Sequence, residues 1–306
     1  MSTLYFESDA PDDVRRPCVY DGHVFVYAPR ASTRAFTEFA RGLIEEAFAP
    51  YDPREAQFEL PVEKFVEIVA PLQPHFIHHP ESKRLIATIL EDLGCDADQT
   101  YFDVPRMRVQ AHDAYLTAGV GYQLHPHRDT WYAAPQSQVN WWLPVFPIES
   151  ESTFAFFPKY FHRAVQNDSD RFDMYEWNAK ARKNAATHVR KDTRWQPMAQ
   201  EELDLEAEFR VVCPPGGLII FSGAQLHATV PNMSGLTRFS VDFRTVHTDD
   251  VVEQRGAPTH DSFGTGTTLR AHLRARDYEP LPEEMARIYD PEPPADAVLV
   301  YKPEPS

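Results

Sequence analysis

A change of character near Tyr101 is the feature that most limits how this chain of 306 residues can fold. Before it, apolar residues recur at helical spacing and predict helices over 31–48, 61–72 and 81–94, after a first strand at 23–28. After it, up to residue 247, turn signals separate short aromatic runs. Those predicted strands are 106–111, 138–146, 153–157, 209–213, 217–221 and 237–246. Helices followed by strands predict an α+β fold with one antiparallel β-sandwich or barrel.

We expect residues 1–306 to form a single domain with three parts. Residues 1–100 give mostly helical support, 101–247 form the β core, and 248–306 form a Pro-rich segment that wraps the surface. A polar, helical insertion at 163–205 interrupts the core. Insertions of this kind commonly cover the mouth of a barrel.

Composition excludes several classes of protein. The formal net charge of −16 repels phosphate backbones, so we expect no nucleic-acid partner. The three cysteines form no CxxC pair, which argues against a disulfide framework or a cysteine-based zinc site and favours a reducing compartment. No signal pattern or membrane-spanning apolar run is present, so we expect a cytoplasmic protein without a membrane partner.

His127 and Asp129 form a His-x-Asp triplet in the segment GYQLHPHRDTWY. In an extended chain, side chains two residues apart project to the same face, so an imidazole and a carboxylate can converge on one ion. His227 follows the apolar strand 217–221, which can return the chain to the same end of a barrel. Two imidazoles and one carboxylate are typical of non-haem Fe(II) sites that keep positions open for other ligands. The alternative for His127 is an ordinary β-strand histidine.

A second group of polar residues lies in the strand-like run TRFSVDFR. Alternation places Arg238, Ser240, Asp242 and Arg244 on one face of that strand. A guanidinium beside a hydroxyl is suited to bind a carboxylate, because arginine donates two parallel hydrogen bonds and serine adds a third. Arg244 competes for this role, and we favour Arg238 because Ser240 lies beside it. A structural salt bridge is the alternative interpretation of Arg238.

Taken together, His127-x-Asp129, His227 and Arg238-x-Ser240 resemble the signature of the Fe(II)/2-oxoglutarate-dependent dioxygenase superfamily, over residues 105–247. The layout is similar to the phytanoyl-CoA-dioxygenase-like branch. Its matching positions are Trp142-Leu143, Phe157-Pro158 and Pro215-Gly216-Gly217. FFPKYFH stands where that branch has a PGSH-like element, which argues against an acyl-CoA substrate.

The resemblance implies a double-stranded β-helix (a cupin-like jelly roll) buttressed by N-terminal helices, with the metal at its open end. It implies Fe(II), O₂ and 2-oxoglutarate as co-substrate, held by Arg238 and Ser240. The implied reaction hydroxylates or otherwise oxidises an unactivated C–H bond, while 2-oxoglutarate is decarboxylated to succinate and CO₂. Asp129 argues against a halogenase, in which the carboxylate position is empty. Two alternatives stay open: a cupin-type metalloenzyme that does not use 2-oxoglutarate, and a non-catalytic jelly-roll binding protein.

Further residues near the triplet are weaker candidates. Asn140 lies on the next predicted strand, where we expect it to hydrogen-bond the 2-oxo acid. Contacts with substrate are predicted at Trp131, Tyr132, His125 and Arg106, with core or surface positions as the alternative. We expect a small-molecule substrate, an amino acid or a natural-product intermediate. The sequence leaves its identity and the oligomeric state open.

Overall fold

The N-terminal part of the molecule is a layer of helices built on apolar faces. The computed structural model describes residues 2–182, 184–189, 191–258, 260–295, 297 and 299. Helix α2, Ala31–Phe48, has the bounds that the sequence predicts, and its buried face carries Phe36, Ile44 and Phe48. The other elements of this part are β1 (Leu4–Phe6), α1 (Asp12–Tyr20), β2 (Val24–Tyr27), α3 (Val62–His78) and α4 (Pro80–Asp92).

Helix α3 runs past the point where the sequence predicts its end. Pro71 and Pro74 lie inside it, although proline removes a backbone donor and normally interrupts a helix. The turns that contain these prolines bury Leu72, Phe76 and Ile77. Burial of this apolar face therefore outweighs the local preference to stop.

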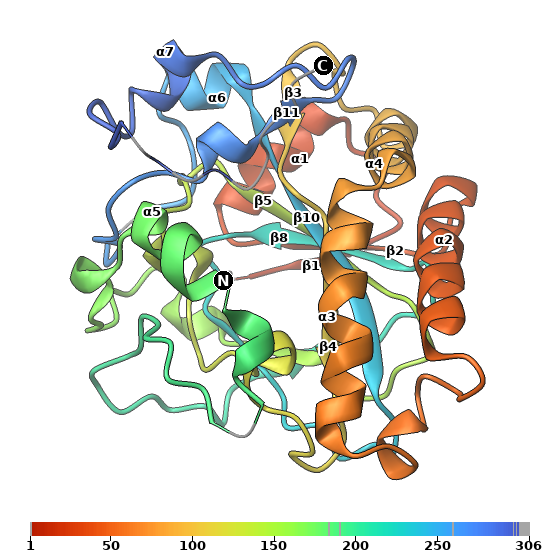
Figure 1. Ribbon diagram of the computed structural model, residues 1–306. Helices are drawn as coiled ribbons and strands as arrows, with labels where there is room; N and C mark the ends of the chain where they lie inside the picture. The colour runs from red at the N-terminus through yellow and green to blue at the C-terminus, as the bar shows by residue number, and fades with distance from the viewer. Residues whose placement is uncertain are drawn as a thin grey trace.

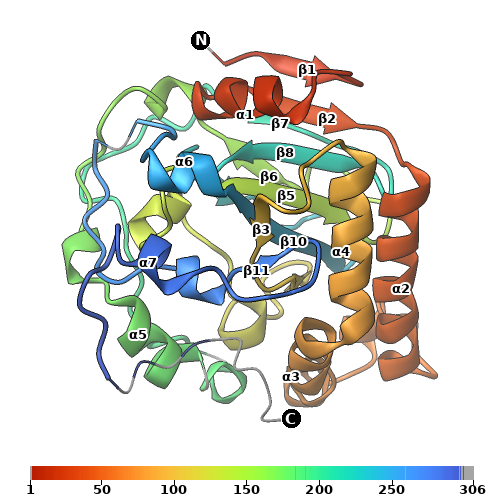
Figure 2. The ribbon, with the colours of Figure 1, turned by 90° about the horizontal axis from the view of Figure 1, so that it is seen from above.

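The central element is an eight-stranded, mainly antiparallel sheet. Its path runs β1-β2-β8-β5-β10-β3-β11, and β4 also pairs with β10. The strands not yet given are β3 (Thr100–Phe102), β4 (Arg106–Gln110), β5 (Val139–Pro144), β8 (Leu218–Ser222), β10 (Arg238–His247) and β11 (Leu273–Arg274). The long strand β10 crosses the middle of the molecule, and α2, α3 and α4 stand together on one side (Figures 1 and 2).

The two faces of the large sheet have different neighbours. Phe239 and Phe243 of β10 point toward the helices, where their rings contact Phe48 and Phe36 at 5.7 and 6.2 Å. The opposite face meets a three-stranded sheet in the order β7-β6-β9, made of Phe209–Arg210, Phe154–Phe156 and His227–Thr229. The rings of Trp142 and Phe154 lie 5.0 Å apart across this interface. The architecture is thus an α+β arrangement with two facing sheets.

The insertion and the C-terminal part contribute short helices on the other side of the molecule from α2, α3 and α4 (Figures 1 and 2). The insertion contains the short helix α5 (Met174–Glu176), a π-helical turn over Trp177–Arg182 and a 3-10 turn over Ala185–Thr187. The C-terminal part contains α6 (Thr248–Val252) and α7 (Glu283–Ala286) and lies on the same side of the sheet as α5 (Figure 2). In the described part of the chain, no helix has both the length and the apolar character needed to cross a membrane.

Candidate metal centre and active-site cavity

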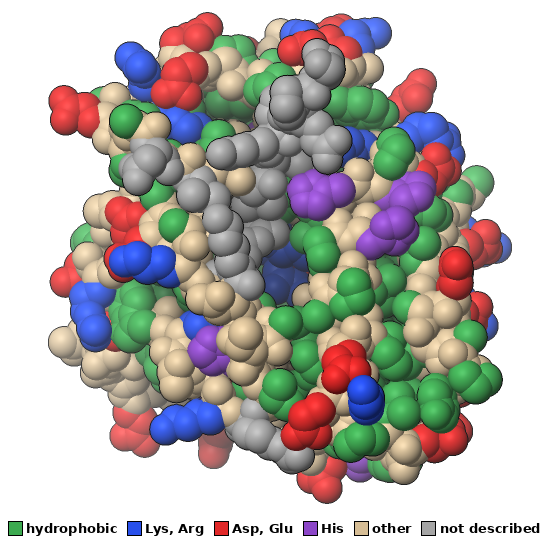
Figure 3. Space-filling model, in the orientation of Figure 1, with side chains coloured by type: hydrophobic (Ala, Val, Ile, Leu, Met, Phe, Trp, Pro, Cys, Tyr) green, Lys and Arg blue, Asp and Glu red, His purple; other side chains and the backbone are tan. Residues whose placement is uncertain are grey.

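A cavity of about 710 Å³ opens between the two sheets, the insertion and helix α3. Its inner part is lined by strand residues that include His127, Asp129 and His227. Its outer part is lined by α3, by the insertion and by C-terminal residues such as Thr268. The space-filling view shows a hollow with basic side chains deep inside it (Figure 3). A pocket of this size is typical of sites for small molecules.

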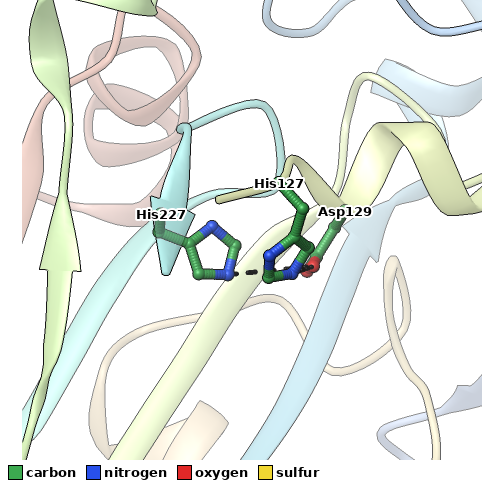
Figure 4. A group of neighbouring side chains, drawn as sticks. All are labelled: His127, Asp129 and His227. Atoms are coloured by element: carbon green, nitrogen blue, oxygen red, sulfur yellow. Dashed lines mark ion pairs between the residues drawn. The ribbon is translucent and has the colours of Figure 1, made fainter. Parts of the chain in front are cut away.

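Backbone pairing brings the three predicted metal ligands together. His127 and His227 form an antiparallel bridge, in which each amide donates to the other's carbonyl at 3.0 Å. The Asp129 amide donates to Gly223 O at 2.8 Å, in the turn between β8 and β9. One ligand atom from each of the three side chains lies within 4.8 Å of the others, and the side chains point toward one another (Figure 4).

Both histidines are held with the same ring nitrogen facing the centre. Nδ1 of His127 lies 2.8 Å from His125 O, and Nδ1 of His227 lies 2.9 Å from Gln225 O. A backbone carbonyl can only accept, so Nδ1 carries the proton and Nε2 keeps a lone pair for a metal. The two Nε2 atoms lie 3.6 and 4.0 Å from Oδ1 of Asp129.

Burial favours the neutral, ligating form of His227. Burial and the neighbouring His127 imidazole lower the pKa of His227 to about 4. Burial acts in the opposite sense on Asp129, but nearby His127 and His227 and the amide of Asn140 hold the pKa of its carboxyl well below the usual range. Near neutral pH the centre therefore offers one carboxylate and a neutral His227 nitrogen, a donor set that suits Fe(II).

The second oxygen of Asp129 accepts two hydrogen bonds and has a guanidinium nearby. Asn140 Nδ2 and Gln138 Nε2 donate to Oδ2 at 2.7 and 3.0 Å, and Arg244 Nε lies 3.9 Å from it. Asn140, which we expected to contact the 2-oxo acid, thus uses its amide to orient the carboxylate. Only Oδ1 faces the two imidazoles, which favours monodentate binding and leaves ligand positions open.

Arg238 and Ser240 supply unused hydrogen-bonding capacity. Nε of Arg238 and Oγ of Ser240 are buried and have no hydrogen-bond partner among the described residues. The guanidinium lines the cavity and lies over the ring of Trp142, 5.7 Å from its centroid. Burial and the nearby charge of Arg108 lower the pKa of Arg238 to about 10, so the group stays protonated at neutral pH. A buried cation with an unsatisfied donor is costly, and an incoming carboxylate would accept from that donor.

Arg244, the competing anchor, is already engaged. Its guanidinium lies 3.3 Å from Asp103 Oδ2 and 3.5 Å from Asp242 Oδ2, in addition to its approach to Asp129. The two arginines of β10 therefore differ in environment although they share a face of the strand. Arg238 is available to a ligand, whereas Arg244 links three carboxylates of the protein.

The four predicted substrate residues occupy different positions. Tyr132 lines the cavity, with its ring edge-on to His127 at 5.6 Å and its hydroxyl donating to Gln196 Oε1 at 3.1 Å. Arg106 also lines it and pairs with Asp103 at 2.7 Å. Trp131 differs from the expectation: it is fully buried among apolar side chains and donates to Asp261 at 3.1 Å. The His125 side chain is exposed to solvent, and its carbonyl orients His127.

Part of the cavity lining lies outside the four predicted substrate residues. Arg108 of β4 donates to Asp242 of β10 at 2.7 Å. The register pairs Arg108 with Ser240, so this ion pair runs diagonally across the two strands. Tyr122 and Phe172 add aromatic rings from two loops. Arg108 lies on the same predicted strand as Arg106, but only the strand register reveals its partner.

Comparisons with known proteins give distant structural matches only. Neither a protein-family model nor a curated protein matches the sequence. Among solved structures, the chain is similar to the non-heme monooxygenase ThoJ in its apo form, with 15% identity, 72% coverage of each chain and a TM-score of 0.39. It is also similar to the epimerase SnoN in complex with Fe³⁺, alpha ketoglutarate and nogalamycin RO, with 13% identity, 78% of this chain, 85% of that one and a TM-score of 0.39.

A third similar structure is EvdO2 from Micromonospora carbonacea var. aurantiaca complexed with 2-oxoglutarate, with 14% identity, 57% of this chain, 62% of that one and a TM-score of 0.37. By their names, these neighbours are non-heme or 2-oxoglutarate-binding proteins. The resemblance to the phytanoyl-CoA-dioxygenase-like branch stays a prediction. The likeness is too distant to assign a function, which has to come from the site itself.

Proposed function

We propose that this protein is a non-haem Fe(II)- and 2-oxoglutarate-dependent oxygenase that hydroxylates an unactivated C–H bond of a small molecule. The observation that carries the proposal is the combination of two features, one in the cavity and one on strand β10, whose Arg238 lines it. Three side chains present one nitrogen or oxygen each to a common point. On β10, the buried Nε of Arg238 and the buried Oγ of Ser240 have no hydrogen-bond partner among the described residues. The first feature suits iron, and the second suits the distal carboxylate of 2-oxoglutarate.

Separate groups of residues would bind the metal and 2-oxoglutarate. His127, Asp129 and His227 hold the metal, and the carbonyls of His125 and Gln225 fix the two ring orientations. Arg238 and Ser240 bind the far carboxylate of 2-oxoglutarate. Bound Fe(II) with 2-oxoglutarate and O₂ would supply the oxidising power, with succinate and CO₂ as co-products.

The outer cavity would position the substrate and exclude water. Tyr132 stands directly against His127, and its hydroxyl is tied to Gln196 of the insertion. The insertion would thus be placed over the reacting carbon, where it shields the site from solvent. Hydroxylation is the proposed outcome, and desaturation, ring closure or epimerisation would begin with removal of the same hydrogen.

We also propose a fold, a domain organisation and a cellular location for the protein. We place the centre at the open end of a cupin-like jelly roll within a single domain of residues 1–306, in a cytoplasmic protein. A cupin-type metalloenzyme without 2-oxoglutarate, or a non-catalytic binding protein, would leave Arg238 and Ser240 as buried polar groups without a function. Other described residues also have such atoms, but those of Arg238 and Ser240 lie on one face of one strand, which weighs against both alternatives.

The test is a mass balance in the presence of Fe(II), O₂ and ascorbate. Protein given 2-oxoglutarate should release succinate and CO₂ in equal amounts, slowly without substrate. Pyruvate, which lacks the distal carboxylate, should support no decarboxylation, and Asp129→Ala should be inactive. Metal binding without any consumption of 2-oxoglutarate, at every concentration and with every candidate substrate, would refute the proposal.

A further inference from the structure

The outer part of the cavity carries a continuous run of rings that begins at a metal ligand. Tyr132 meets His127 edge-on at 5.6 Å, and Phe172 meets Tyr132 edge-on at 5.2 Å. Trp177 of the insertion follows at 6.1 Å from Phe172. All four residues line the cavity, so the run forms one wall of the path to the metal. We refer to Tyr132, Phe172 and Trp177 as the aromatic wall.

The aromatic wall is held in place by a salt-bridged arginine. Arg194 lies over the rings of Trp177 and Tyr122, 5.6 and 6.0 Å from their centroids. Its guanidinium is paired with Asp192 at 2.6 Å and donates to Gly119 O at 3.0 Å. The charge of Arg194 is therefore used within the protein, and the wall presents mainly ring surface to a ligand.

The charged groups of the cavity discriminate between classes of substrate. Among the described lining residues, the carboxylates are Asp103, Asp129 and Asp242. Asp103 is paired with arginines 106 and 244, Asp242 with arginines 108 and 244, and Asp129 is a proposed metal ligand. None of the three is left over for an ammonium group of a substrate.

The cations of the cavity, in contrast, are partly open to a ligand. Arg108 keeps 37% of its side chain exposed although it is paired with Asp242. Apart from Arg194, which Asp192 balances, four arginines and three carboxylates are among the described lining residues, so the cavity is positive although the whole chain carries −16. The field inside the cavity therefore favours neutral or negative ligands and disfavours cations.

From these two observations we propose the substrate class: a neutral or acidic molecule that carries aromatic rings and stacks on the aromatic wall. A free amino acid is excluded by the same reasoning, because its ammonium group would be buried beside arginines without a carboxylate partner. The substrate class rests on the proposed function for its chemical meaning. The binding preference itself can be measured without turnover.

The test is a set of calorimetric titrations with three matched probes, in the presence of Mn(II) and 2-oxoglutarate. The probes are 2-naphthol, its saturated analogue 2-decalol, and 2-naphthylmethylammonium. We expect 2-naphthol to bind about tenfold more tightly than either of the others, because decalol loses ring stacking and the ammonium meets like charge. Equal or tighter binding of decalol or of the ammonium probe, or no saturable binding of 2-naphthol, would overturn the inference.

Two variants in the insertion locate the binding site. Trp177→Leu should weaken 2-naphthol binding about fivefold, because one stacking surface is lost. Trp195→Leu is the matched control, since Trp195 is not among the residues that line the cavity and instead lies beneath Arg171 at 4.8 Å. Equal weakening by both changes would contradict the assignment.

The same titrations separate this inference from the proposed function. Trp177→Leu should leave 2-oxoglutarate binding unchanged, because Trp177 lies in the insertion and Arg238 on β10. If wild-type protein fails to bind 2-oxoglutarate, the proposed function fails. The ranking of the three probes still decides the substrate class.

Discussion

Arg238 and Arg244 lie on the same face of β10, and exchanging each for glutamine separates an anchor from a structural residue. We expect Arg238→Gln to retain iron and to raise the KM for 2-oxoglutarate strongly. Loss of a buried, charge-assisted pair with a carboxylate costs about 3 kcal/mol, within the range for such truncations. At about 1.4 kcal/mol per factor of ten, this corresponds to a loss of affinity of roughly 150-fold.

A lysine at the same position gives an intermediate case. Arg238→Lys keeps the charge but loses the two parallel hydrogen bonds, so we expect about half of the free-energy loss and a roughly tenfold higher KM. Arg244→Gln should leave the KM for 2-oxoglutarate within about threefold of wild type, because its guanidinium serves Asp103, Asp242 and Asp129.

Stability measurements test the roles of Arg238 and Arg244 independently of the kinetics. Without ligand, the buried Nε of Arg238 has no partner, so Arg238→Gln should not lower the Tm of the ligand-free protein. Arg244→Gln leaves carboxylates without their cation and should lower the free energy of unfolding by roughly 3 kcal/mol. Succinate assays over a range of 2-oxoglutarate concentrations give the KM. Thermal unfolding of the same samples gives the stability. Normal turnover of Arg238→Gln at low 2-oxoglutarate would refute the anchor assignment.

Three further changes probe the centre and its cover. Asn140→Ala removes the 2.7 Å hydrogen bond to Asp129, and we expect Fe(II) affinity in competition with a chelator to fall about 10- to 100-fold; an unchanged affinity would refute the positioning role. His227 has its pKa lowered to about 4, so the unfolded state binds more protons between about pH 4 and 6.5, and the metal-free protein should lose up to about 3 kcal/mol of stability as the pH falls through that window. Denaturant titrations should show a shallower pH dependence for His227→Gln, and an identical slope would contradict this. Gly119→Ala adds a Cβ 2.2 Å from Ala185 O at a φ of +59°, so limited proteolysis should cut the insertion faster than in wild type.

Much of the fold follows from local patterns in the sequence. Helix α2 and strand β10 lie where apolar periodicity predicts them, because each buries a regular face of its own. Strand β9 has only three residues and is defined by its pairing with β6, so no local pattern predicts it. The continuation of α3 through two prolines likewise depends on tertiary packing.

The candidate site likewise contains residues that local patterns predict and residues whose roles depend on tertiary structure. Local patterns identify four of the candidate residues. These patterns are the spacing of His127 and Asp129 and the alternation of Arg238 and Ser240. The role of Asn140 depends on the register that pairs it with Arg244, which brings both groups to Asp129. Trp131 and Tyr132 are adjacent in a 3-10 turn, and successive residues of such a turn point in different directions. The ring of Trp131 therefore lies in the core and that of Tyr132 in the cavity. No local pattern in the sequence predicts this difference.

We propose above all that metal and 2-oxoglutarate share one site in this chain. The most direct measurement is an anaerobic calorimetric titration of 2-oxoglutarate into protein with and without Fe(II). We predict one 2-oxoglutarate per chain, at least about tenfold tighter binding when Fe(II) is present, and loss of most of this affinity in Arg238→Gln. Binding that is indifferent to Fe(II) and to Arg238, or no binding at all, would contradict the account.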